Sequence, residues 1–131
     1  IEAGASGVIV PNHGGRPLDG QPATIEALPA ITRRLGGSVP VLLDGGVRRG
    51  TDVLKALALG ADAVLIGRPV LHALAVAGAP GVAHALTLLR TELEVAMTLT
   101  GCATIAGIGP HVVAAGDAPS ETAPSRVTGR G

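Results

Sequence analysis

The sequence predicts an α/β fold on a parallel sheet, because three short apolar runs alternate with helical patterns. The runs lie at residues 7–10, 39–43 and 63–66, are rich in aliphatic side chains, and are bounded by Gly, Pro or Asp. They do not alternate apolar with polar residues, a pattern typical of parallel strands buried on both faces. A helical pattern follows each run, so the expected order is β-α-β-α-β-α with right-handed crossovers.

Helix-start and helix-stop residues bound the helical patterns. Thr24 is expected to cap a first helix that continues to Leu35, with a kink or a split at Pro29. Thr51 is expected to cap a second helix that ends at Gly60. A longer helical region follows, and its apolar stripe has helical spacing: Val82, Leu86, Leu89, Leu93 and Met97.

The chain of 131 residues suits one domain. We expect residues 1–113 to form part of a larger domain, because the sequence has no initiator Met and enters in the middle of a pattern. Residues 114–131 are small, polar and Pro-containing, which predicts a disordered tail. The chain has no Phe, Tyr or Trp, which indicates either a core of small residues or aromatic parts of the fold outside this chain.

Composition narrows the functional classes. Hydrophobic residues make up 47% and charged residues 15% of a chain with zero formal net charge, which argues for a packed core and against binding to nucleic acid. We expect neither a signal peptide nor a transmembrane segment, and therefore a cytoplasmic protein. Cys102 is the single cysteine, so it forms no internal disulfide and is read as a small buried apolar residue.

The chemistry is expected where each strand ends. The three runs lead into residues 12–16, 44–50 and 67–69, which carry most of the glycines and arginines around the strands. In parallel α/β folds, ligands bind at the carboxyl ends of the strands. Glycines let backbone N–H groups approach an anion, and arginine binds phosphate with two N–H groups. The strings DGGVRRG and GRP therefore predict a phosphate cradle, to which the helix opened by Thr51 would add its N-terminus.

His13 is the titratable group at a strand end that suits proton transfer near neutral pH. Arg16 could hold an anionic substrate beside it. His13 could equally be a turn residue bonded to backbone, and Asp44 could either bond a cofactor hydroxyl or cap its turn. The other histidines are expected at the surface or between helices, and no pair has the spacing of metal ligands.

Three segments carry a resemblance to a known family. They are IVPNHGGRPLDGQPATIEALP, VLLDGGVRRGTDVLKALALGADAVLIGRP and ELEVAMTLTGC. They resemble the FMN-dependent α-hydroxy-acid oxidases and dehydrogenases, the group of glycolate oxidase, lactate oxidase and mandelate dehydrogenase. The match covers about residues 1–108, and the NHGGR-LDG string is its most specific part.

The resemblance implies a partial TIM (β/α)₈ barrel, namely its last three βα units with C-terminal helices. It implies FMN as cofactor and oxidation of a small L-2-hydroxy acid, with oxygen, a quinone or a cytochrome as electron acceptor. It implies that His13 is the catalytic base and that His13 and Arg16 bind the substrate. It also implies a homo-oligomer for the complete family member and a set of FMN-binding residues: Asp44, Gly45, Gly46, Val47, Arg48, Gly67 and Arg68.

The chain departs from the family in two ways. Pro11 stands where the family usually has a Ser whose hydroxyl contacts the flavin, and proline offers neither a hydroxyl nor an N–H. The chain is also shorter than the ~250 residues of a typical barrel. Two alternatives follow: an inactive remnant or weak phosphate-binding fragment, and another barrel such as a type 2 isopentenyl-diphosphate isomerase or an inosine-monophosphate-dehydrogenase-like enzyme.

Overall fold

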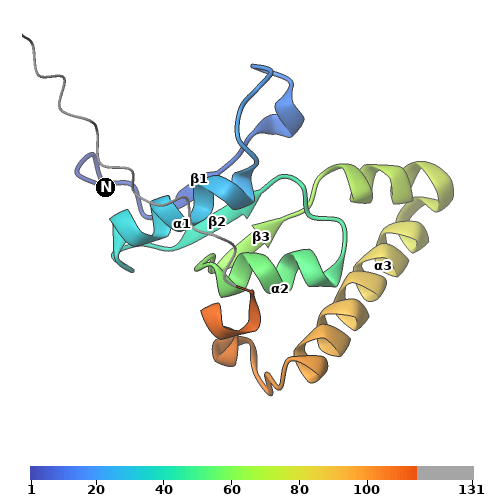
Figure 1. The fold of residues 1–131 in the computed structure, drawn as a ribbon. Helices are drawn as coiled ribbons and strands as arrows, with labels where there is room; N and C mark the ends of the chain where they lie inside the picture. Colours follow the sequence, from blue (N-terminus) through green and yellow to red (C-terminus); the bar gives the residue numbers. More distant parts are fainter. Residues whose placement is uncertain (115–131) are drawn as a thin grey trace, which may run out of the picture.

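The computed structural model describes residues 1–114, which form a three-stranded parallel sheet with helices after the strands (Figure 1). The strands are β1 (Val8–Val10), β2 (Val41–Asp44) and β3 (Ala63–Leu65), in the order β1-β2-β3. The main helices are α1 (Thr24–Leu35), α2 (Gly50–Ala58) and α3 (Arg68–Leu99). Three short 3-10 helices are η1 (His13–Gly15), η2 (Ile105–Gly107) and η3 (Pro110–Val112). The predicted order of strands and helices is confirmed, whereas residues 115–131 of the predicted tail lie outside the described residues.

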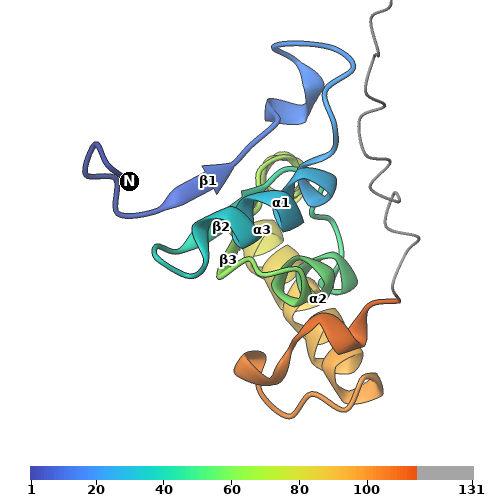
Figure 2. The same cartoon turned by 60° about the vertical axis from the view of Figure 1, so that its left-hand side comes forward.

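One face of the sheet carries the core. Val41 and Leu43 of β2 are 3% and 2% exposed, and they pack with Leu28 of α1 and Ala56 of α2. Figure 2 shows α1 and α2 on the same side of the strands. Ile9, which points to the other face, is 52% exposed. Burial on both faces, predicted from the apolar runs, is therefore wrong for the described chain, because its two crossover helices cover one side.

The start of α1 differs from the prediction. Thr24 is the first helical residue rather than the cap, and its Oγ1 donates instead to the Gly45 carbonyl at 3.2 Å. The N–H of Ala23 is bound by Glu26 Oε2 at 3.2 Å, so a carboxylate inside the first turn replaces a capping hydroxyl. The helix also continues through Pro29 as one element, so the predicted split does not occur.

The start of α2 differs in the same way. The helix begins at Gly50, after Arg49, so Thr51 lies inside it and caps nothing. Asp52 supplies the capping oxygen, as described below. Helix α2 ends at Ala58, and Gly60 follows with φ +97°, a conformation that favours glycine. The predicted helix is therefore confirmed, whereas the choice of Thr51 as its cap was wrong.

Helix α3 is long, apolar and bent. Its backbone leaves helical geometry at Ala77 and Gly78, just before Pro80, a usual cause of a kink. By length and composition alone α3 could cross a membrane, with none of its apolar window buried. The break at Ala77 and Gly78 lies within this helix, and the absence of a transmembrane segment stays a prediction. From the predicted stripe, Leu89 is buried whereas Leu86 is 48% exposed.

Candidate functional site

A pocket of about 280 Å³ lies at the carboxyl ends of the three strands, where Figure 1 shows the segments after β1, β2 and β3 leaving the sheet on one side. Asp44, the last residue of β2, pairs in register with Leu65 at the end of β3. The pocket brings together every site residue that the sequence predicted: His13, Arg16, Asp44, Gly45, Gly46, Val47, Arg48, Gly67 and Arg68. Their placement at one edge is the placement expected from a parallel sheet; their chemical roles stay predictions.

The turn after β1 holds His13 in a rare conformation. His13 is the one non-glycine residue among residues 1–114 with positive φ, at +50°. Asn12 stabilises this turn twice: its Oδ1 accepts the Gly14 N–H at 3.0 Å, and its carbonyl accepts the Gly15 N–H at 2.8 Å. Strain of this kind persists where the surroundings fix the chain. The exposed imidazole of His13 is therefore presented to the pocket by a turn that Asn12 closes.

The turn after β2 packs closely against the turn after β1 at Gly45. A Cβ on Gly45 would lie 2.8 Å from Asn12 Oδ1, and its φ of +107° already favours glycine. Thr24 Oγ1 donates to the Gly45 carbonyl at 3.2 Å from the start of α1. Asn12 and Thr24 therefore fix the loop from two sides. Sequence reasoning missed both roles, although an Asn two residues after a strand and two residues before a glycine pair is a recognisable turn signal.

The backbone N–H groups near the pocket divide into paired and free ones. Asp52 Oδ2 accepts the N–H groups of Arg48 and Arg49, each at 3.0 Å, and Glu92 Oε2 accepts that of Gly50 at 2.7 Å. Two of the chain's own carboxylates thus already lie at the N-terminus of α2. Negative groups there disfavour a further anion, and the predicted part of this N-terminus in holding a phosphate stays a prediction.

Three backbone N–H groups in the pocket lining have no hydrogen-bond partner among the described residues. The N–H groups of Gly46, Val47 and Gly67 donate no hydrogen bond within residues 1–114. All three residues line the pocket, together with the exposed guanidinium groups of Arg48 and Arg68. Unpaired amides beside guanidinium groups form a concave donor set that fits a phosphate monoester. This donor set is of the kind expected to bind the phosphate end of a nucleotide such as FMN.

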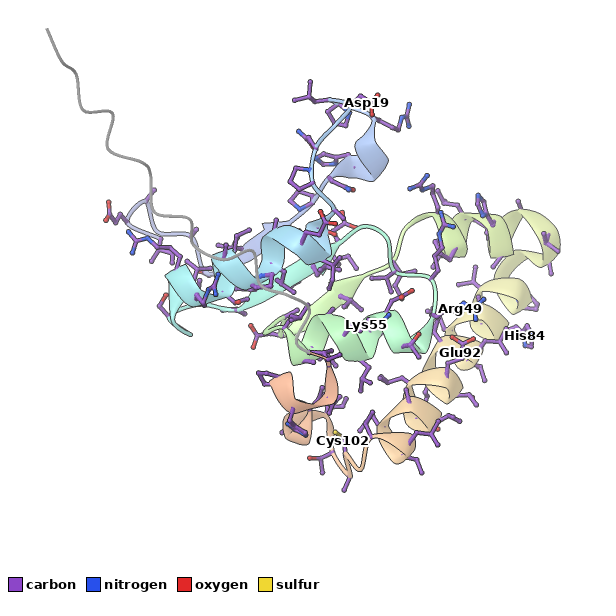
Figure 3. All side chains as sticks on the ribbon, viewed as in Figure 1. Asp19, Arg49, Lys55, His84, Glu92 and Cys102 are labelled. Atoms are coloured by element: carbon purple, nitrogen blue, oxygen red, sulfur yellow. The ribbon has the colours of Figure 1, made fainter. Side chains whose placement is uncertain are left out.

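Other predicted features have simpler outcomes. Cys102 is 7% exposed, as expected of a small buried residue. His72, His84 and His111 are exposed, and Figure 3 shows His84 on the outer side of α3. Among the described residues, no group of three or more His, Cys, Asp or Glu could hold a metal ion. Pro11, directly after β1, is exposed and does not line the pocket.

The sequence model of a family described as FMN-dependent dehydrogenase matches residues 1–115. This chain belongs to the FMN-dependent dehydrogenase family. The match covers the three strands, the pocket residues and α3, so the resemblance carried by the NHGGR and DGGVRRG strings is confirmed. Within this family, the chain is 58% identical over 113 residues to an L-lactate oxidase of Roseobacter sp. (strain GAI101). The aligned region covers 86% of the chain and 30% of that oxidase.

The chain is also similar to a curated oxidase and to an oxidase of known structure. A peroxisomal (S)-2-hydroxy-acid oxidase of Oryza sativa subsp. japonica is 57% identical over 118 residues, covering 89% of the chain and 32% of the relative. A mandelate oxidase solved with a monooxide FMN adduct superposes with a TM-score of 0.79 at 53% identity, over 82% of this chain and 34% of that one. The described chain is therefore part of a (β/α)₈ barrel, and it spans about a third of the length of these relatives.

Proposed function

We propose that this chain carries the FMN-phosphate cradle and the proton acceptor of an enzyme that oxidises an L-2-hydroxy acid to the 2-oxo acid. The supporting observation is one pocket that is lined by both His13 and the Arg48–Arg68 pair. We place the chain as the last three βα units of a complete barrel. Barrel enzymes commonly bind phosphate at the loops after their last two strands, and here those loops follow β2 and β3.

The cradle accounts for affinity toward the phosphate end of FMN. The N–H groups of Gly46, Val47 and Gly67 have no partner within residues 1–114 and belong to residues of the pocket lining, so we assign them to donate to the phosphate. Arg48 and Arg68 add two guanidinium groups on neighbouring strand ends, against the single carboxylate of Asp44 in the pocket lining. When bound, FMN supplies the acceptor for the electron pair that leaves the substrate.

The substrate half of the pocket comes from the turn after β1. Converting HO–Cα–H to C=O breaks the O–H and Cα–H bonds, and one electron pair and two protons leave. We assign His13 to accept a proton, because imidazole can take and release one near neutral pH. We assign Arg16 to bind the substrate carboxylate through paired N–H···O bonds. The substrate class is supported by the names of relatives, which include lactate, mandelate and (S)-2-hydroxy-acid oxidases.

Oxygen is the proposed electron acceptor, because these relatives are named oxidases; a quinone or a cytochrome is the alternative. Assembly of the complete enzyme into a homo-oligomer is also part of the proposal. The predicted cytoplasmic location stays a prediction, and one relative is named as peroxisomal.

A hybrid enzyme tests the proposal. In this protein, called the completed barrel below, the chain replaces the segment that it matches in the Roseobacter L-lactate oxidase. We expect it to bind FMN and, without oxygen, to lose its yellow colour on addition of L-lactate, glycolate or (S)-mandelate. His13→Gln should retain FMN and slow this bleaching by at least about 100-fold. The exposed His84 on α3 offers a matched control, since His84→Gln should bleach at the unchanged rate. Bleaching unaffected by His13→Gln would remove the assignment of the base.

A second candidate is an inactive fragment that binds phosphate weakly. The observation that favours it is the exposed face of the sheet at Ile9. The 131-residue chain alone distinguishes the two. If it purifies with stoichiometric flavin, the fragment candidate fails; if the completed barrel binds no flavin, the first proposal fails.

A further inference from the structure

Glu92 connects the far part of α3 to the loop that carries the cradle. Its Oε2 accepts the Gly50 N–H at 2.7 Å across 42 positions of sequence. Figure 3 shows Glu92 and Arg49 together, where α3 passes the start of α2. Glu92 does not line the pocket. Its contact with the site therefore runs through the backbone at the end of the phosphate loop.

The backbones of α2 and α3 touch at the same point. Gly50 is buried, and a Cβ on it would overlap Leu93 N, at 2.1 Å, and Glu92 C, at 2.4 Å. Only glycine allows the two helices to approach this closely. The hydrogen bond from Gly50 and the absence of its side chain therefore act together to dock the first turn of α2 on α3.

This docking closes a ring around the cradle. Arg68 is the first residue of α3, and Arg48 lies two residues before Gly50. The ring runs from Arg68 along α3 to Glu92, across the hydrogen bond to Gly50, and back past Arg48 to β2. The pairing of β2 with β3, the strand before Arg68, closes it. Helix α3 is bent at Ala77–Gly78 within that ring. The relative position of the two guanidinium groups thus depends on the contact that Glu92 makes.

We infer that Glu92 is a positioning residue for the phosphate cradle, acting through Gly50 to hold Arg48 opposite Arg68. The inference rests on the proposed function of the pocket. If Glu92 has a purely structural role, its substitution should lower the stability of the protein and weaken the binding of all flavins equally. A positioning role weakens the ligand that has a phosphate and spares the one that lacks it, so FMN and riboflavin separate the two.

The test measures dissociation constants of FMN and riboflavin for the completed barrel. Glu92→Ala should raise the FMN constant about 10-fold, the size expected for losing a charge-assisted hydrogen bond, and change the riboflavin constant less than about 2-fold. Glu92→Gln keeps an acceptor oxygen in the same shape and should recover part of the loss. Glu94→Ala is the matched control: Glu94 lies on the same helix, is exposed, and pairs with Arg90 at 2.7 Å.

The outcomes separate this inference from the proposed function. Arg68→Gln should also lower the preference for FMN over riboflavin; if it does not, the proposed cradle fails. If Arg68→Gln lowers that preference and Glu92→Ala does not, the inference alone is overturned. Equal weakening of both flavins by Glu92→Ala and Glu92→Gln would also overturn it, because it would assign Glu92 a structural role. If Glu92→Ala does not fold, the isosteric Glu92→Gln variant tests the inference instead, through the same comparison of the FMN and riboflavin dissociation constants.

Discussion

Gly14 lies directly against the guanidinium group of Arg68: a Cβ at Gly14 would come 2.8 Å from Arg68 Nη2 and 3.2 Å from Cζ. The turn that presents His13 therefore touches the side chain assigned to the phosphate. Gly14 and Arg68 therefore link the turn after β1 with the start of α3 at the pocket, where His13 and Arg68 both belong to the lining.

This contact predicts different effects for two neighbouring glycines. Gly14→Ala and Gly15→Ala both place a side chain at positive φ, +69° and +76°, at a cost of roughly 1–2 kcal/mol. A Cβ at Gly15 meets nothing within 4 Å, whereas one at Gly14 must displace the Arg68 guanidinium. We expect similar thermal stability for the two variants and about 10-fold weaker FMN binding for Gly14→Ala. Equal FMN dissociation constants for the two variants would show that the contact between Gly14 and Arg68 does not affect FMN binding.

Asn12 gives a second prediction. Asn12→Ala removes the acceptor of the Gly14 N–H, a bond of 3.0 Å that holds the His13 turn. We expect kcat with L-lactate to fall about 5- to 10-fold with FMN content retained, since a lost hydrogen bond costs about 1 kcal/mol. Asp19→Ala is the matched control, because Asp19 Oδ1 accepts the Gly20 N–H at 3.0 Å in a turn outside the pocket. Similar kcat values for the two variants would contradict the role of Asn12.

The docking of α2 on α3 predicts a sharp loss of stability at one glycine. Gly50→Ala would force a Cβ into the backbone at Leu93, and we expect the free energy of unfolding to fall by about 2–3 kcal/mol. Gly107→Ala serves as control, since its Cβ would meet Thr104 Oγ1 at an ordinary 3.4 Å. Denaturant unfolding of both variants measures the difference. A Gly50→Ala protein as stable as Gly107→Ala would mean that the two helices are not docked as described.

Sequence reasoning located the strands and the pocket residues because both depend on local chemistry. Apolar runs mark strands, and glycines with arginines directly after them mark a ligand edge. It failed at Thr24 and Thr51, where hydroxyl residues at the expected positions lost the capping role to carboxylates of Glu26, Asp52 and Glu92. Glu92 could not be found this way, because its partner Gly50 is 42 residues distant and only packing brings them together.

The two adjacent arginines Arg48 and Arg49 offer the most direct measurement of the central claim. Arg48 lines the pocket, whereas Arg49 lines a separate groove beside Glu92 and α3. In the completed barrel, the ratio of the riboflavin to the FMN dissociation constant reports the contribution of the phosphate. A phosphate cradle that includes Arg48 predicts that Arg48→Gln lowers this ratio by about 10- to 100-fold and that Arg49→Gln changes it less than about 3-fold. Ratios lowered equally by both substitutions, or by neither, would contradict it.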